Sequence, residues 1–554
     1  MKNQKGITIV SLIITIIVMV ILAGIALAFS VGENGIITKA EDAKAKTEIA
    51  TEKEKLQEAV VATIGSSGKV NLDNIVLPDG FIEISKEENT VIYQGPSGQQ
   101  YEVENETGKI TEIEAVEDLE ITTDTQGVTF TKSDGVTPGD SNNLKNGDIV
   151  IYGDYKYTYS SNNQGWRVAV LDTTKEQYGK IAEDIYEKPV TSLSETFANC
   201  TNMKIAPEIP KGVINIAGAF KDCNSLTQTP KLPTTIISMA YSFYNCTSMD
   251  GKITIPSGVK NLERVFCNCS SLTVAPEIPE GVTNLGYTFY KCSSLKNAPE
   301  IPNGVTNMAA TFEGCKTLTN APKLPSGLME IGATFRDCSS LTVAPEIPPG
   351  VTSMAYTFRG CSSLVEAPQI PDKVTNMQHT FNGCTSLTEV SEIPEGVTKL
   401  EYTFANCVSL KNAPEIPSKV THMDNTFNGC KSLTKAPEIP SDVTNMGATF
   451  SNCSSLVKAP KIPNNVKDMS YTFNGCISLV EAPEIPVNVI NMTVTFQGCR
   501  KLQGEIIINA SPTAYSSCFN GASSQGSGII LKGSSTVLNE LAATNNNGKV
   551  IVGN

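Results

Sequence analysis

A cysteine occurs at every 23rd position of this chain from Cys200 to Cys499, and each of these cysteines follows a phenylalanine by three residues. A strict period of this length indicates that one repeat is one supersecondary unit, which cannot bury its apolar face alone and must stack on its neighbours. The sequence therefore predicts a repeat solenoid of fourteen 23-residue repeats over residues 190–503. Function must then be sought on an extended surface.

Six columns of the repeat are apolar in nearly every copy. Written from Cys269, one repeat reads CSSLTVAPEIPEGVTNLGYTFYK, and its apolar columns are Cys269, Leu272, Ile278, Val282, Leu285 and Phe289. Columns that stay apolar point inward in a stacked solenoid, so we expect the cysteines to be buried thiols. Spacing alone leaves disulfides open, because stacking at about 4.8 Å would bring successive Cα atoms into bonding range.

The columns Cys-x-x-Leu, Ile-Pro, Val-Thr and Phe-x-x-Cys resemble the BspA-type leucine-rich repeats of bacterial surface proteins over residues 190–525. The resemblance implies a curved, mainly β solenoid with a parallel sheet on its inner face and irregular or short helical segments outside. This chain reads Leu-x-x-Ala-Pro-x-Ile-Pro, and a proline in each strand removes a hydrogen-bond donor. We therefore expect strands of about two to four residues. Phe519 and Ala522 keep the register, so residues 504–554 are expected to form a degenerate repeat and a C-terminal cap.

The N-terminal region combines a polar leader, residues 1–6, with an uncharged apolar stretch, residues 7–31, which is long enough to cross a bilayer as a helix. Lysines in the leader place the C-terminal part outside the cell by the positive-inside rule. The leader, which ends in Gly6 directly before the apolar stretch, resembles that of type IV pilins and pseudopilins. The resemblance implies that a prepilin peptidase cuts between Gly6 and Ile7 and that the new N-terminus is methylated. A plain signal anchor is the alternative interpretation.

Ser11 departs from the pilin pattern, because that family usually carries a glutamate at this position. The glutamate neutralises the N-terminal amine of the neighbouring subunit inside the filament. Because a buried amine without a carboxylate partner is costly, Ser11 disfavours a filament made of this protein alone. Membrane anchoring and incorporation as a minor subunit remain open.

Three segments connect the apolar stretch to the repeats. Residues 32–65 are rich in Ala, Glu and Lys, which predicts an amphipathic stalk helix. Residues 66–115 alternate apolar and polar positions around turn signals, which predicts a small antiparallel β region like that of a pilin head. Residues 116–189 contain a further hairpin pattern and are expected to form a β-hairpin domain or linker and the N-terminal cap of the solenoid.

Two variable columns are candidate binding residues, because specificity in a solenoid resides in its exposed, variable positions. The column two residues before phenylalanine holds tyrosine at several levels, with Arg264 and His379 at others, and tyrosine suits protein or glycan contacts. Rings that merely cover the outer ridge are the alternative. The column between the two prolines would form an acidic stripe on the inner sheet, for which solvation alone is the alternative account. The candidates are Tyr241, Tyr287, Tyr356, Tyr402 and Tyr471 in the first column and Glu277, Glu300, Glu392, Glu415 and Glu438 in the second.

Composition excludes several functions. A net charge of -14 argues against a nucleic-acid partner. The chain has two histidines and evenly spread cysteines, so it predicts neither a metal site nor a cofactor, and no catalytic constellation stands out. We therefore expect that the protein is not an enzyme.

The sequence predicts a membrane-anchored leucine-rich-repeat protein of the bacterial cell surface. It would span the membrane once, with its C-terminal part extracellular, and mediate adhesion or recognition of an extracellular protein or glycan through the solenoid. The alternative is a minor pilin or pseudopilin, which would contact pilus or pseudopilus subunits in a surface filament. The resemblance of the leader to that of prepilins implies the prepilin peptidase as a processing partner.

Overall fold

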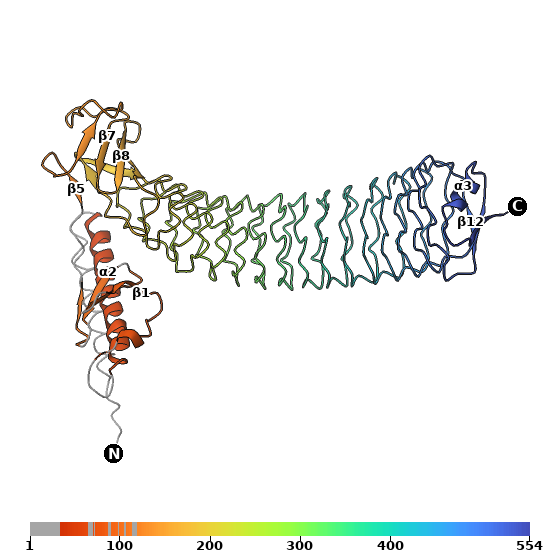
Figure 1. Cartoon of the computed structure of the whole chain (residues 1–554), viewed down its shortest axis with the longest axis horizontal. Coiled ribbons are helices and arrows are strands. Elements are labelled where there is room, and N and C mark those ends of the chain that lie inside the picture. Colours follow the sequence, from red (N-terminus) through yellow and green to blue (C-terminus); the bar gives the residue numbers. More distant parts are fainter. Residues whose placement is uncertain are drawn as a thin grey trace, which may run out of the picture. The chain divides into compact units, whose positions relative to one another are not determined.

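The protein forms two compact units, Met1–Glu117 and Asp118–Asn554, in the computed structural model shown in Figure 1. The structure describes residues 34–64, 70, 72–86, 90–97, 99–104, 107–112 and 119–553. The expected leader and transmembrane helix, with Gly6, Ile7 and Ser11, lie outside these residues. Among the residues that are described, no helix is both long enough and apolar enough to cross a membrane.

The N-terminal unit packs one helix, α2 (Asn34–Val61), on a four-stranded antiparallel sheet in the order β1-β2-β3-β4. Leu56 and Val60 of α2 are buried among sheet residues such as Tyr93 and Val103. Glu52 fixes the helix to the β2–β3 loop, because its carboxylate accepts hydrogen bonds from the Ser97 backbone nitrogen and hydroxyl, each at 2.6 Å. One face of the expected stalk helix is therefore buried. The other elements of this unit are η2 (Leu72–Asn74), β1 (Ile82–Lys86), β2 (Thr90–Gln94), β3 (Gln100–Glu104) and β4 (Ile110–Glu112).

The second unit begins with a seven-stranded mixed sheet in the order β5-β10-β11-β9-β8-β7-β6. Trp166 of β9 is fully buried, and its indole nitrogen donates to the carbonyl oxygen of Ile185 at 3.0 Å. The last strand, β11, leads into the repeats through a parallel bridge between Ser192 and Asn215. The strands are β5 (Glu120–Ile121), β6 (Thr129–Thr131), β7 (Ile149–Tyr152), β8 (Tyr155–Ser160), β9 (Gly165–Val170), β10 (Asp184–Ile185) and β11 (Lys188–Ser192).

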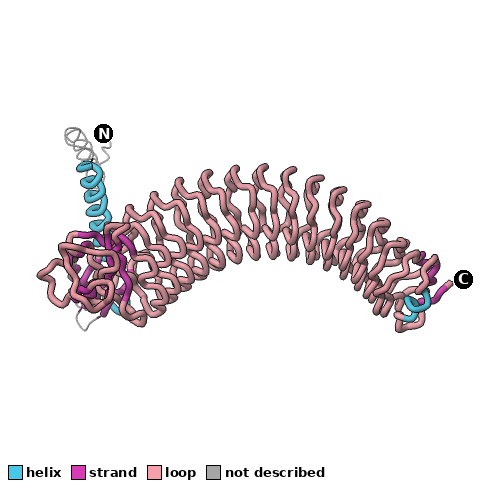
Figure 2. Tube along the Cα trace, turned by 90° about the horizontal axis from the view of Figure 1, so that it is seen from above, coloured by secondary structure: helices cyan, strands magenta, loops and turns pink. Residues whose placement is uncertain are grey.

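The repeats form a curved solenoid, which Figure 2 shows as a bowed row of stacked turns. The expectation of strands of two to four residues was wrong. Between β11 and Gly504, where every residue is described, the turns are joined by isolated parallel bridges such as Asn284–Asn307 and Val274–Asn297. Proline explains the difference at Val274, which lies two residues before Pro276, and at Asn284 the chain passes directly into turns, so neither set of bridges extends into strands.

A second set of hydrogen bonds stacks each turn on the next. In the repeat around Phe289, the backbone nitrogens of Leu285, Tyr287 and Phe289 donate to carbonyl oxygens 22 residues ahead, each at 2.9 Å. The intervening nitrogens of Thr288 and Tyr290 donate to carbonyls three residues back within the same turn, at 3.0 and 3.2 Å. Buried backbone groups are thus satisfied without a regular sheet, as a solenoid interior requires.

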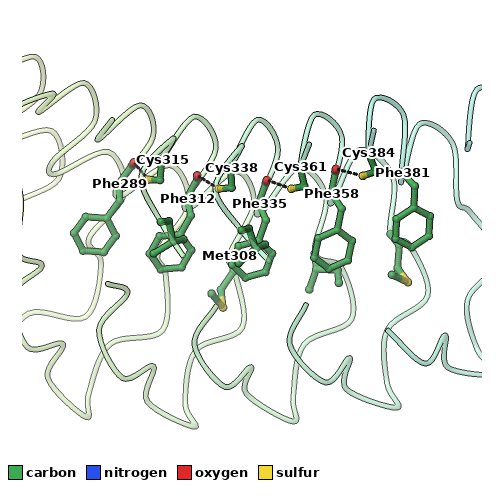
Figure 3. Packing of buried hydrophobic residues seen from close by; sticks show 14 of the residues in the cluster. Phe289, Met308, Phe312, Cys315, Phe335, Cys338, Phe358, Cys361, Phe381 and Cys384 are labelled. Carbon is green, nitrogen blue, oxygen red and sulfur yellow. Dashed lines mark hydrogen bonds between the residues drawn. The ribbon is translucent and has the colours of Figure 1, made fainter. Parts of the chain in front are cut away.

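The core is one continuous cluster in which like residues of successive repeats form columns, and Figure 3 shows part of it. Neighbouring phenylalanines from Phe197 to Phe519 stack with ring centroids 5.3 to 5.9 Å apart. All sixteen cysteines of the chain are buried free thiols, which confirms the first interpretation and excludes disulfides. The Cys361 thiol donates to the carbonyl oxygen of Phe335 at 3.1 Å, and the same bond recurs from turn to turn.

The C-terminal end closes with a three-stranded parallel sheet in the order β12-β13-β14. Phe519 extends the phenylalanine column by stacking on Phe496 at 5.3 Å, in the register that the sequence predicts. The elements are β12 (Gly504–Ile507), β13 (Ile529–Lys532), α3 (Leu538–Ala543) and β14 (Val550–Val552).

Candidate recognition surface

The candidate tyrosines lie in one column, five residues before each repeat cysteine, which we call the tyrosine ridge. Tyr241, Tyr287 and Tyr356 are half-buried, whereas the side chains of Tyr402 and Tyr471 are exposed at 37% and 46%. Each residue of the ridge occupies the same place on its turn, so side chains from successive repeats can touch. In chain order the ridge is Glu195, Gly218, Tyr241, Arg264, Tyr287, Ala310, Ala333, Tyr356, His379, Tyr402, Asn425, Ala448, Tyr471 and Val494.

Two groups on the ridge form stacks. The His379 ring lies between Tyr356 and Tyr402, with centroid distances of 4.5 and 4.6 Å and interplanar angles of 10° and 8°. The Arg264 guanidinium lies over the rings of Tyr241 and Tyr287 at 5.4 and 4.6 Å. Both arrangements hold flat aromatic faces in a fixed orientation, because each stacked pair contributes about 0.5–1.5 kcal/mol.

The surroundings of the histidine in the first stack favour its neutral form. Burial lowers the pKa of His379, and the guanidinium groups of Arg359 and Arg336 lower this pKa further, against an opposing effect of Glu401. The guanidinium groups of Arg336 and Arg359 also lie over the ring of Tyr356, at 5.9 and 5.8 Å, so cations flank this stack as well as the Arg264 group.

The backbone of the ridge is left-handed at every level, with φ between 50° and 61° at its residues other than glycine. A second column, the residue directly before each cysteine, has the same conformation but holds Gly, Asn or Asp at nearly all levels, as at Asn268, Gly314 and Asp337. Those residue types reduce the cost of a positive φ. The ridge instead carries tyrosines at a cost of about 1–2 kcal/mol each. The conformation is a property of the repeat, since Ala310, Ala333 and Val494 share it at other levels of the column.

The candidate glutamates Glu277, Glu300, Glu392, Glu415 and Glu438 are all exposed. Within residues 119–553, none of the five makes a hydrogen bond or an ion pair. These five carboxylates are solvated and lack the side-chain contacts that fix the geometry of the ridge.

A notch interrupts the ridge between Tyr402 and Tyr471. Its volume is ≈ 390 Å³, and Gly447 and Ala448 are the small residues of its lining. Sequence reasoning missed this notch, because the same Gly-Ala pair also occurs at Gly332 and Ala333, so the pair at Gly447 does not stand out in the sequence. The lining residues are Asp424, Asn425, Asn428, Gly447, Ala448, Ser451, Ser470 and Tyr471.

The core thiols are protonated, and the described residues form no metal cluster. Burial raises the pKa of the thiols in the core, to about 12 for Cys476, so they hold their protons and are poor nucleophiles. Within the part of the chain that the structure describes, no group of three or more His, Cys, Asp or Glu side chains could hold a metal ion.

Comparison with known proteins identifies the repeats. The family model described as "BspA type Leucine rich repeat region (6 copies)" matches residues 190–319, 286–380, 308–434, 354–480 and 424–547. No protein with a curated description matches the chain.

Several solved structures resemble the chain. A leucine-rich repeat protein from Bacteroides ovatus is 23% identical, with a TM-score of 0.45, and the match covers 64% of this chain and 94% of that one. A leucine-rich cell surface protein from Faecalibacterium prausnitzii is 24% identical over 57% of this chain and 94% of that one, with a TM-score of 0.41. The pneumococcal vaccine antigen PcpA is 15% identical over 74% of this chain and 100% of that one, with a TM-score of 0.39.

Proposed function

Because the chain belongs to the BspA-type leucine-rich-repeat family, we propose that it is a cell-surface recognition protein without enzymatic activity, whose tyrosine ridge binds an extracellular protein or glycan. The ridge is preferred over the glutamate column because its side chains are held in place before a ligand arrives. A pre-ordered surface binds at a lower entropic cost than one that must be ordered by its ligand.

The observation that carries this proposal is the stack of Tyr356, His379 and Tyr402. Its rings are parallel within 10°, and they stand on a left-handed backbone at φ values of 61°, 56° and 58°. Stacking between the rings offsets part of the backbone cost, and it leaves the outer ring of Tyr402 exposed. Aromatic rings of this kind give a large contact area while losing few side-chain conformations.

The experiment compares two double variants of the full-length protein in a binding assay on immobilised extracellular matrix, host-cell surfaces and bacterial surfaces. His379→Ala with Tyr402→Ala removes the stack, and Glu392→Gln with Glu415→Gln neutralises two exposed carboxylates in the same region. We expect the first variant to lose binding by about tenfold or more, which corresponds to about 1.4 kcal/mol, and the second to bind normally. The reverse result would show that the glutamate column, and not the tyrosine ridge, binds the ligand. If the wild type bound none of these surfaces, the proposed recognition function would be rejected.

Residues 7–31 are proposed to anchor the protein in the bacterial membrane as a single span with the repeats outside. The support for this anchor is their uncharged apolar sequence. Limited digestion of intact cells tests it, since an outward-facing solenoid should be cleaved from the surface. Protection of the repeats until the cells are lysed would refute the orientation.

The second candidate function, a minor pilin or pseudopilin, is supported by the leader ending at Gly6 and by the packing of α2 on an antiparallel sheet. Processing by a prepilin peptidase and contact with pilus or pseudopilus subunits are part of this proposal. Intact mass and terminal sequencing of the protein from sheared surface fractions would test it. A methylated N-terminus at Ile7 supports the candidate, whereas an uncut Met1 confined to membranes rejects it.

A further inference from the structure

The notch between Tyr402 and Tyr471 differs from the rest of the ridge because it is concave and polar. With a volume of ≈ 390 Å³ it lies near the lower end of the range of about 300–1,000 Å³ typical of small-ligand sites. A Cβ atom added at Gly447 would lie 3.4 Å from Asp424 Oδ1 and 3.6 Å from Ser470 Oγ. The glycine therefore keeps these two oxygens accessible on either side of one bare turn.

Tyr471 forms the aromatic wall of the notch and is the ridge tyrosine with the least structural support. Its φ is 56°, its side chain is 46% exposed, and its neighbours on the ridge are Ala448 and Val494. Among the described residues, no other aromatic ring stacks on the Tyr471 ring and no lysine or arginine side chain lies over it. The cost of its left-handed backbone is thus not offset by ring stacking as it is at Tyr402.

Hydrogen-bonding groups line the remainder of the notch. The Asn428 amide donates to Asn425 Oδ1 at 2.8 Å, which leaves a second N–H on the Asn428 nitrogen. Ser451 Oγ accepts from Asn452 at 3.2 Å and keeps its own proton to donate. The Ser470 hydroxyl makes no hydrogen bond with any described residue. Donors and an acceptor carboxylate, Asp424, therefore surround a space beside one aromatic face.

We propose that this notch binds a neutral sugar, a monosaccharide unit or disaccharide at the end of a glycan, with its ring packed on Tyr471 and its hydroxyls bonded to Asp424, Asn428, Ser451 and Ser470. The inference rests on the proposed recognition function and names the ligand class for one part of the ridge. A pyranose presents one face of C–H groups, which suits an aromatic ring, and an edge of hydroxyls that both donate and accept.

The lining disfavours other ligands. An acidic sugar would place its carboxylate near that of Asp424, and no lysine or arginine is among the lining residues to compensate. Burial raises the pKa of Asp424, which reflects the cost of keeping this charge where solvent is partly excluded. A peptide recognised through its side chains needs apolar pockets or a sheet edge, and the notch provides neither.

The test measures binding of methyl glycosides to the full-length protein by saturation-transfer NMR. The probes are the glycosides of glucose, galactose, mannose, N-acetylglucosamine and N-acetylgalactosamine, with those of sialic and glucuronic acid as anionic counterparts. Ala448→Tyr fills the notch with a side chain that the same column already carries at Tyr402 and Tyr471, and Tyr471→Ala removes the aromatic wall. Val457→Tyr is the matched control, because it adds the same ring to an exposed site of the same repeat outside the notch.

We expect at least one neutral glycoside to bind, both notch variants to weaken it by about tenfold or more, and the control to bind like the wild type. If circular dichroism shows that Ala448→Tyr is misfolded, the binding measured with Tyr471→Ala decides the proposal. The proposal fails if no neutral glycoside binds, if the anionic ones bind better, or if the notch variants bind normally. If it fails while His379→Ala with Tyr402→Ala still loses surface binding, recognition by the ridge stands and only the ligand class is wrong.

Discussion

Replacing Phe358 by alanine should destabilise the centre of the solenoid by about 3–5 kcal/mol. The side chain is fully buried, and its ring stacks on those of Phe335 and Phe381, each at 5.8 Å. Loss of apolar burial accounts for about 1.5–3 kcal/mol. The two ring contacts add about 0.5–1.5 kcal/mol each, and the cavity that remains brings the total toward the upper end of the range.

The position of Phe358 also predicts how the protein unfolds. Each repeat contacts only its neighbours, so a defect in the middle of the array weakens the coupling between its two halves. Trp166 is the single tryptophan and lies in the N-terminal sheet of the second unit, so its fluorescence reports that end. Hydrogen exchange at the repeats around Phe450 and Phe473 reports the other end. In guanidinium, the two transitions should coincide in the wild type and separate in Phe358→Ala.

The control is Val365→Ala, which truncates a side chain that is 45% exposed in the following turn. It should change stability by no more than about 0.5 kcal/mol and leave the transitions coincident. A loss below about 1 kcal/mol in Phe358→Ala, with both transitions unmoved, would refute the view that the phenylalanine column couples the repeats.

Three further predictions concern the thiols, the left-handed turns and one carboxylate. Burial raises the pKa of Cys267 to about 11, and it also raises the pKa of the repeat thiols. Iodoacetamide should therefore modify these cysteines only in denaturant, and mass spectrometry would count the modified residues. Rapid labelling of the native protein would contradict the burial. Gly383→Ala should lower the free energy of unfolding, measured by chemical denaturation, by about 1–2 kcal/mol, because φ of Gly383 is 79°. The new methyl group itself would meet only Gly360 atoms at 3.6 and 3.7 Å, so the loss reports the backbone, and Gly383→Asn should lose less stability. Equal stability of all three proteins would refute the backbone argument. Hydrogen bonds from the Gly179 nitrogen and Lys175 lower the pKa of Asp154 below 3.8, so its stabilisation is present above that pH and is lost as the pH falls through the folded value. The free energy of unfolding of the wild type and of Asp154→Asn, both followed by Trp166 fluorescence, should therefore differ less toward low pH. A difference that does not change with pH would exclude this linkage.

Much of the solenoid could be predicted from the sequence, because burial in a stacked array depends on the residue type of a column. The cysteines and phenylalanines repeat without a slip from Phe197 to Cys499, and like residues stacked on like residues fill one continuous core. The small or amide residue before each cysteine was a further readable signal, since Gly314 and Asn268 take a positive φ. Its meaning became clear only from the backbone.

The strands could not be predicted, because their extent depends on competition between two sets of hydrogen bonds. Proline removes donors on one side of each turn, which the sequence shows. Leu285, Tyr287 and Phe289 donate backbone hydrogen bonds to the next repeat from a segment that also forms i→i−3 hydrogen bonds within its own repeat. No local sequence pattern reveals this combination. The result is a stacked array with isolated bridges where short strands were expected.

By itself, the sequence determined the period, the buried columns and the family of the repeats, and it singled out the tyrosine column as variable. Only the tertiary structure decided which of its side chains stack and where the column opens into a notch. The stack of Tyr356, His379 and Tyr402 and the gap at Gly447 and Ala448 join residues from successive turns. Such contacts depend on how closely the turns approach and on the direction in which a left-handed backbone points each side chain, and both are properties of the stacked chain.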